Sequence, residues 1–411
     1  MKIHMGVIMK LNYKHTMYAS FTGYIVQAII NNFIPLLFLT FQSSYNIPIS
    51  KITFLVTFNF GFQLVIDFLS AGFIDKIGYR TSVIIAHVCS AIGLLSLTIL
   101  PEIFNDPFIG LLLSVMIYAI GGGLIEVLIS PIVEACPTDN KKTAMSLLHS
   151  FYCWGHVGVV LLSTIFFTLF GISNWKILTI ILAIIPIANT IFFMKVPIMN
   201  LIEENKNGLT IKELLSQKIF WIMVMLMICA GASEQSISQW ASTFAEKGLG
   251  VSKSIGDLTG PMLFAVMMGT SRIVYSKFGE KVDLEKSMIY SGALCLLSYL
   301  IISLSPWPIL SLIGCSLCGL SVGILWPGTF SISASKIKSG STAMFAFLAL
   351  AGDVGCSIGP TVVGKVSSMF NDNIKIGIIA ASIFPILLIV CVFINRFMRK
   401  THTSIVKNIK I

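Results

Sequence analysis

Three acidic residues lie inside long apolar segments of the chain, where an ionised carboxylate is costly. Glu126 lies just after a run of three glycines, Glu234 lies among alanine, serine and glutamine residues, and Asp353 lies in a glycine-rich segment. At membrane depth a carboxyl group must be protonated, paired with a cation or solvated by a cavity. A group that alternates between these states can bind and release a proton. We therefore identify all three as candidate proton-coupling residues, with a structural hydrogen bond or a fixed ion pair as the alternative.

Amide side chains recur at helical spacing in two of the apolar segments. Gln27 and Asn31 are four residues apart, as are Gln235 and Gln239, which lie beside Trp240. Amides both donate and accept hydrogen bonds, which suits a hydroxylated solute, although contacts between helices are the alternative. The candidate solute-binding residues are Gln27, Asn31, Ser130, His149, Gln235, Gln239, Trp240 and Trp326.

A third polar stripe and two histidines also lie in the predicted helices. Asn59, Gln63 and Asp67 share one face of a predicted helix, where they either line a cavity or bond to neighbouring helices. His149 and His156 share roughly one face of another helix and could relay protons or serve packing. Two histidines are too few ligands for zinc, so we expect no metal site and no cofactor.

The composition indicates which elements must position these residues. Hydrophobic residues make up 55% of the 411 residues and charged residues 11%, against roughly 25% charged in an average soluble domain. So few charges exclude a soluble enzyme, a disordered chain and a coiled coil. The net charge of +10 is explained by basic loops beside an anionic membrane surface, so we expect a lipid bilayer and no nucleic acid as partner.

Twelve apolar runs are long enough to cross a bilayer, which takes about 20 residues. These runs are 16–40, 52–74, 81–101, 108–135, 143–170, 176–196, 219–243, 258–278, 286–304, 307–331, 341–369 and 374–397. With both termini inside, 22 of the 28 basic residues, Arg272 among them, fall on the inner side. The sequence therefore predicts an all-α membrane protein in the cell (plasma) membrane with both termini cytoplasmic.

The predicted spans form two similar sets. Gly123 and Pro131 in the fourth span recur at one offset as Gly319 and Pro327 in the tenth. A hydrophilic stretch, 197–218, separates the sets and contains the start of a short amphipathic helix. We expect a six-helix half at 1–196, a cytoplasmic linker at 197–218 and a second six-helix half at 219–411. Parallel repeats of this kind are typical of transporters with a site between the halves.

The segment that follows the second span carries a known signature. Residues 71–80, AGFIDKIGYR, resemble the loop signature G-x-L-A-D-R-x-G-R-R of the major facilitator superfamily. Asp75, Gly78 and Arg80 match it, and Gly72 is adjacent to the position of its first glycine. The resemblance implies the major facilitator fold, alternating access, and a role for these four residues in a gate.

A finer resemblance concerns the fourth and first spans. The string GGGLIE at 121–126, followed by Ser130 and Pro131, resembles the fucose permease-like branch of proton–sugar symporters, as does the pair Asn31-Asn32. The aspartate that follows the paired asparagines in that branch has no match in this chain. The resemblance implies proton-coupled uptake of a sugar-like solute.

The function expected from these features is secondary active transport by a monomer. The leading expectation is proton-coupled uptake of a sugar-like or other small polar solute, and the alternative is proton-coupled export of drugs or metabolites. A G-x-x-x-G-P exporter signature is absent from the fifth span, although Gly355 to Pro360 in the eleventh is similar. An enzyme is not expected, because the string GLSVG at 319–323 lies in mid-span, where a hydrolase nucleophile turn cannot form.

Overall fold

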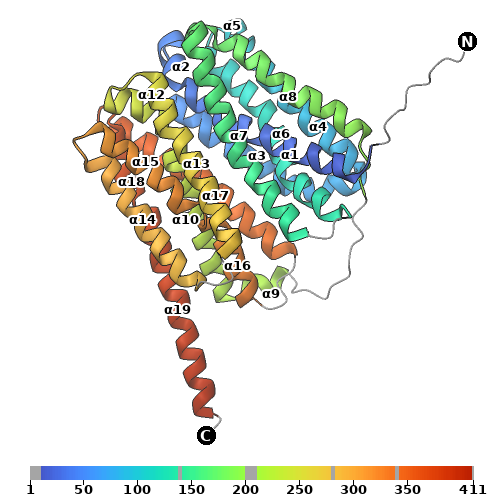
Figure 1. Ribbon diagram of the computed structural model, residues 1–411, viewed down its shortest axis with the longest axis vertical. Coiled ribbons are helices and arrows are strands. Elements are labelled where there is room, and N and C mark those ends of the chain that lie inside the picture. The colour runs from blue at the N-terminus through green and yellow to red at the C-terminus, as the bar shows by residue number, and fades with distance from the viewer. Residues whose placement is uncertain (1–10, 138–140, 200–210, 279–282, 338–341, 410–411) are drawn as a thin grey trace, which may run out of the picture.

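The fold is helical throughout the part of the chain that the structure describes. A computed structural model describes residues 11–137, 141–199, 211–278, 283–337 and 342–409 (Figure 1). No β-strand occurs among these residues, as expected for a chain whose backbone polar groups must be satisfied within lipid.

The long helices of the first half are connected by short ones. They are α1 (Tyr13–Asn32), α3 (Ile49–Ile77), α4 (Tyr79–Leu97), α6 (Pro107–Ala135), α7 (Lys141–Phe170) and α8 (Trp175–Lys195). The short elements are η1 (Ile34–Leu37), α2 (Phe38–Tyr45), α5 (Leu100–Ile103) and η2 (Ile172–Asn174). The predicted linker region contains α9 (Ile211–Ser216).

The second half has more interrupted helices. Its long elements are α10 (Lys218–Ser238), α13 (Leu263–Phe278), α14 (Leu284–Leu304), α15 (Pro308–Val322), α16 (Leu325–Lys336), α17 (Thr342–Met369), α18 (Ile374–Ala381) and α19 (Ile383–Ile409). Between α10 and α13 lie α11 (Ala241–Thr243), the π-helix η3 (Phe244–Gly248), α12 (Lys253–Asp257) and the π-helix η4 (Leu258–Met262).

Eleven helical segments of the described chain are long and apolar enough to cross a membrane. They include every predicted span except 258–278, which is occupied by η4 and α13 and is less apolar. Arg272 lies in this segment, and its side chain is only 19% exposed. The sequence analysis placed Arg272 among the basic residues on the cytoplasmic side of the membrane. That assignment was wrong, because Arg272 points into the bundle.

Small residues allow the helices of each half to approach closely. A Cβ at Gly93 of α4 would collide with the backbone of Tyr118 in α6. A Cβ at Gly355 of α17 would collide with the carbonyl oxygen of Ile228 in α10. At these two contacts the backbones pack directly on one another, as small residues permit in membrane bundles.

The ends of the long helices form two faces of the bundle. We call the side at which α1 begins and α3 turns into α4 the near face, and the side of α2, α5 and α12 the far face. The three far-face helices lie toward the top of Figure 1, and α9 lies toward the bottom. The turn between α3 and α4 is made by Gly78, whose φ of 83° is strained for other residues.

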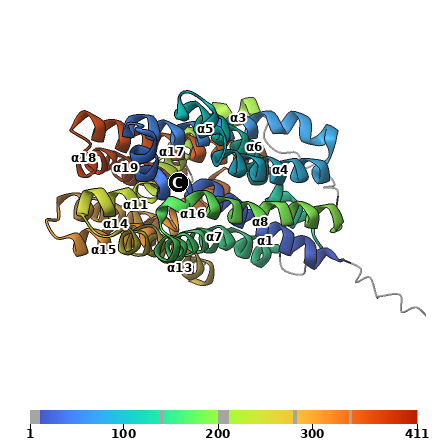
Figure 2. The same cartoon turned by 90° about the horizontal axis from the view of Figure 1, so that it is seen from above.

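Several of the described hydrogen bonds between the two halves lie toward the far face. Lys253 Nζ donates to the Leu36 carbonyl at 2.7 Å, and the hydroxyls of Thr168 and Ser254 are 2.8 Å apart. Deeper in the bundle, Thr57 of α3 hydrogen bonds to Thr361 of α17. The halves also pack along α7 and α13, which lie side by side in Figures 1 and 2. The structure is therefore closed at the far face.

Candidate functional site

Three carboxyl groups meet where the two halves touch. Asp67 of α3 and Glu126 of α6 belong to the first half, and Asp353 of α17 belongs to the second. One oxygen from each lies within 4.8 Å of the other two, and Asp353 is only 6% exposed. Carboxylates this close in a poorly solvated interior cannot all be ionised without protons or a cation between them. We call these three residues the carboxyl cluster.

Amides of the first half hold one side of the carboxyl cluster. Gln27 Nε2 donates to Glu126 Oε2 at 3.3 Å and to Gln63 Oε1 at 3.0 Å. Gln63 Nε2 in turn donates to Asn31 Oδ1 at 3.0 Å. Asp353 Oδ2 is buried and has no hydrogen-bond partner among the described residues. The side chains of Asp353 and Asp67 are hydrogen bonded to each other, so the cluster joins the two halves directly.

An ion pair connects α13 with α10. Arg272 Nη2 is 3.5 Å from Glu234 Oε2, and Gln235 Nε2 donates to Glu234 Oε1 at 3.2 Å. The Glu234 side chain is 8% exposed. Arg272 Nε has no hydrogen-bond partner within the described part of the chain. Glu234, a predicted proton-coupling residue, therefore faces a cation rather than the carboxyl cluster.

Residues of the first half face this pair. The hydroxyls of Tyr24 and Ser130 are 2.9 Å apart, and the ring centroids of Tyr24 and His149 are 5.3 Å apart. Arg272 lies within electrostatic range of both Tyr24 and His149. The His149 side chain is exposed, although it lies beside the buried Tyr24 ring. The arrangement brings donors and acceptors from both halves to one central region.

The remaining predicted solute-binding residues are buried, except for Trp326. Gln239 Nε2 donates to Gln235 Oε1 at 2.9 Å and to the Asn31 carbonyl at 3.0 Å. Trp240 is fully buried and donates to the Pro360 carbonyl at 3.1 Å. In this state these groups serve contacts between helices. Trp326 is half-buried and packs against Gly352, next to Asp353.

The predicted gate residues divide into two pairs. Gly72 and Asp75 lie within α3, but their side-chain positions are outside the described part of the structure. Gly78 makes the turn after α3, and Arg80 donates to the carbonyls of Phe193, Met194 and Val196 at 2.8–3.0 Å. Arg80 thus fastens α4 to the end of α8, a role within one half. His156, a possible proton relay, is buried at 2% exposure.

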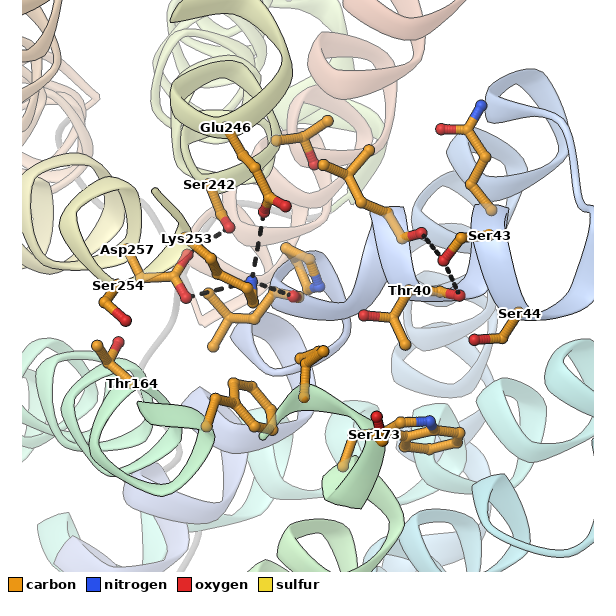
Figure 3. Close-up of a pocket in the computed structure, with 18 residues that line it drawn as sticks. Thr40, Ser43, Ser44, Thr164, Ser173, Ser242, Glu246, Lys253, Ser254 and Asp257 are labelled. Atoms are coloured by element: carbon orange, nitrogen blue, oxygen red, sulfur yellow. Dashed lines mark hydrogen bonds and ion pairs between the residues drawn. The ribbon is translucent and has the colours of Figure 1, made fainter. Parts of the chain in front are cut away.

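A cavity of about 880 Å³ opens at the far face between the halves (Figure 3). Lys253 lies in it, 3.2 Å from Asp257 and 4.0 Å from Glu246, and 5.9 Å from the Phe167 ring of the first half. Serine and threonine hydroxyls of α2 line its other side, as Figure 3 shows. This cavity could not be predicted from the sequence, because Lys253 resembles any other loop lysine.

Comparison with known proteins identifies the architecture. The sequence profile described as Major Facilitator Superfamily matches residues 17–360. Among curated proteins, membrane protein MosC of Rhizobium meliloti is 22% identical over 261 residues, which cover 62% of this chain and 61% of that protein's length. The chain therefore matches less than two thirds of that relative.

Solved structures of transporters share the fold. The E. coli fucose:proton symporter has a TM-score of 0.64 and 16% identity, with 93% of this chain and 99% of that chain covered. A D-xylose–proton symporter has a TM-score of 0.75 and 14% identity, with 93% and 95% covered. The xylose transporter of E. coli in a partially occluded inward-open conformation has a TM-score of 0.75 and 15% identity, with 94% and 97% covered.

Proposed function

The chain belongs to the Major Facilitator Superfamily and is a multi-pass membrane transporter rather than an enzyme, and from this premise we propose that it couples proton movement to the uptake of a sugar-like or other small polar solute. In this proposal the two halves rock about the central region and expose it to one side of the membrane at a time.

The carboxyl cluster is the observation that carries the proposal. In the structure, Asp67 of α3 and Glu126 of α6 in one half lie together with Asp353 of α17 in the other. Protons on the cluster remove the repulsion between carboxylates and so favour this contact, whereas loss of protons favours separation. A proton bound or released here therefore biases the equilibrium between the two arrangements, which is the requirement for coupling.

The solute class rests on the groups around the centre. Tyr24, Ser130 and His149 offer hydroxyl and imidazole groups beside a charged donor and acceptor. Such groups suit a solute with several hydroxyls, because each hydroxyl can donate one bond and accept others. The structurally similar fucose:proton and D-xylose–proton symporters agree with this choice of solute.

The orientation proposed for the molecule is termini inside, in the plasma membrane. Even without Arg272, the basic residues strongly favour the side that holds the termini. The near face is then cytoplasmic, and the far-face contacts close the outer side.

Uptake into proteoliposomes tests the proposal. Radiolabelled neutral hexoses and pentoses are offered with an inward proton gradient, with no gradient, and with a gradient collapsed by a protonophore. We expect at least one sugar to be concentrated inside only in the presence of the gradient. Uptake that merely equilibrates in all three conditions contradicts coupling, and gradient-driven extrusion would instead identify an exporter.

A further inference from the structure

Arg272 is a buried guanidinium whose donors are largely unused. Its pairing with Glu234 is long, at 3.5 Å, and its other described contacts are Met268 Sδ at 3.8 Å and the side chain of Cys153. Its Nε has no hydrogen-bond partner among the described residues. A guanidinium has five N–H donors, and a buried donor without a partner destabilises the fold. This arrangement is therefore completed by a ligand that supplies acceptors.

The neighbouring groups restrict the chemistry of that ligand. Glu234 lies beside Arg272 and balances its charge, and its Oε1 already accepts from Gln235. A carboxylate ligand would pair with Arg272 but would be repelled by Glu234, and an ammonium ligand would meet the opposite difficulty. A hydroxyl accepts from the guanidinium and donates to the carboxylate, so a pair of adjacent hydroxyls satisfies both residues at once.

We propose that Arg272 and Glu234 together bind adjacent hydroxyls of an uncharged polyhydroxylated solute and reject its acidic and amino analogues. The inference rests on the proposed transport of a hydroxylated solute and gives Glu234 a binding role in place of proton coupling. Tyr24 and His149 lie across from the pair in the first half. A solute held between them contacts both halves, as alternating access requires.

Removing the charge of Glu234 or of Arg272, one at a time, tests the proposal. Affinities for galactose, galacturonate and galactosamine, and for the matching glucose series, are measured by titration calorimetry on purified protein without a proton gradient. Wild type should bind a neutral sugar best. In Glu234→Gln, Arg272 is left uncompensated, so binding of the uronate relative to the neutral sugar should rise by about tenfold or more. In Arg272→Gln the amino sugar should gain in the same way.

Two further variants keep the test decisive if a single exchange disturbs folding. The double variant Arg272→Gln/Glu234→Gln carries no charge at the pair and should lose discrimination against both charged analogues. Glu285→Gln removes another buried acid of the second half, whose Oε1 lies 2.9 Å from Lys336 Nζ and which is not part of the Arg272–Glu234 pair. This variant should leave the preference unchanged.

The outcomes separate this inference from the proposed function. Unchanged relative affinities in the folded variants, or a wild type that binds none of the six sugars, would overturn the hydroxyl-binding role. If the variants change the sugar preference as predicted but wild-type protein does not accumulate sugar under a proton gradient, only proton coupling is refuted.

Discussion

In the proposed cycle, Asp353 links the protonation of the carboxyl cluster to the arrangement of the two halves. It is the one member of the cluster contributed by α17, and its Oδ2 has no hydrogen-bond partner among the described residues. Moving the second half away from the first would leave Asp67 and Glu126 together and place Asp353 elsewhere. The number of carboxyl groups brought together in the interior therefore differs between the two arrangements. The protonation of Asp353 thus depends on the arrangement of the two halves.

The sequence predicted part of this site and missed the rest for clear physical reasons. Glu126 and Asp353 stand out because each lies well inside an apolar run. Their meeting with Asp67 depends on the packing of three helices, which no spacing in the sequence encodes. Arg272 lies six residues from the end of α13, so it reads as a basic residue at a membrane boundary. Only the packing of α13 against α15 and α7 turns its side chain inward.

Arg80 yields a prediction at the residue scale. Because it donates to three carbonyls at the end of α8, Arg80→Gln should destabilise the protein by about 1 kcal/mol. The measurement is thermal unfolding in detergent, with Arg80→Lys as a partial replacement. An unchanged unfolding temperature together with slowed transport would show that Arg80 acts in the gate instead.

At the scale of elements, α17 has two distinct packing surfaces. Gly355 contacts the backbone of α10 within the second half, whereas Gly364 contacts Thr53 of α3 across the interface. One helix therefore contributes to the stability of its own half and to closure between the halves. The first contact is permanent in our account, and the second breaks in each transport cycle.

Gly364→Val tests this division. The added side chain collides with Thr53, so the far-face contact should be disfavoured. A single cysteine placed at Thr57 in a background without other cysteines should then react faster with a membrane-impermeant thiol reagent. Gly61→Val on α3, where the structure leaves open space, is the matched control. Equal labelling rates in Gly364→Val and the control would contradict the role of this contact.

Lys253 yields a second prediction at this scale. It joins Asp257 of its own half to the Leu36 carbonyl of the other. Lys253→Gln removes the ion pair and should raise labelling of the same cysteine at Thr57. Lys247→Gln provides the comparison, because Lys247 pairs with Asp372 inside the second half at 3.1 Å. If both lysine variants label at the wild-type rate, Lys253 does not hold the far face closed.

Most long elements could be predicted from the sequence, and most short ones could not. The run 52–74 corresponds to α3 (Ile49–Ile77), and 81–101 overlaps α4 (Tyr79–Leu97). Hydropathy identifies such helices because a segment that crosses the lipid bilayer needs a long run of apolar residues. The far-face elements α2, α5 and α12 are short and partly polar, so they carry no comparable signal. The far-face cavity was missed together with them.

At the scale of the whole molecule, the closed far face and the carboxyl cluster describe one state of the proposed cycle. The two halves touch along α3 and α17 and along α7 and α13. The cluster lies between the first pair, and the Arg272–Glu234 pair lies between α10 and α13. In the account proposed here, the proton and the solute therefore act on different contacts of the same rocking motion, which couples their movements without a direct bond between them.

Transport by Glu126→Gln tests the coupling most directly. The amide resembles a permanently protonated carboxyl, so the variant should bind solute and exchange it across the membrane. It should not concentrate solute under an inward proton gradient. In proteoliposomes we predict exchange of labelled sugar at close to the wild-type rate, with accumulation reduced to the equilibrium level. Glu285→Gln should accumulate sugar normally. Gradient-driven accumulation by Glu126→Gln at the wild-type level would contradict the assignment of proton coupling to the carboxyl cluster.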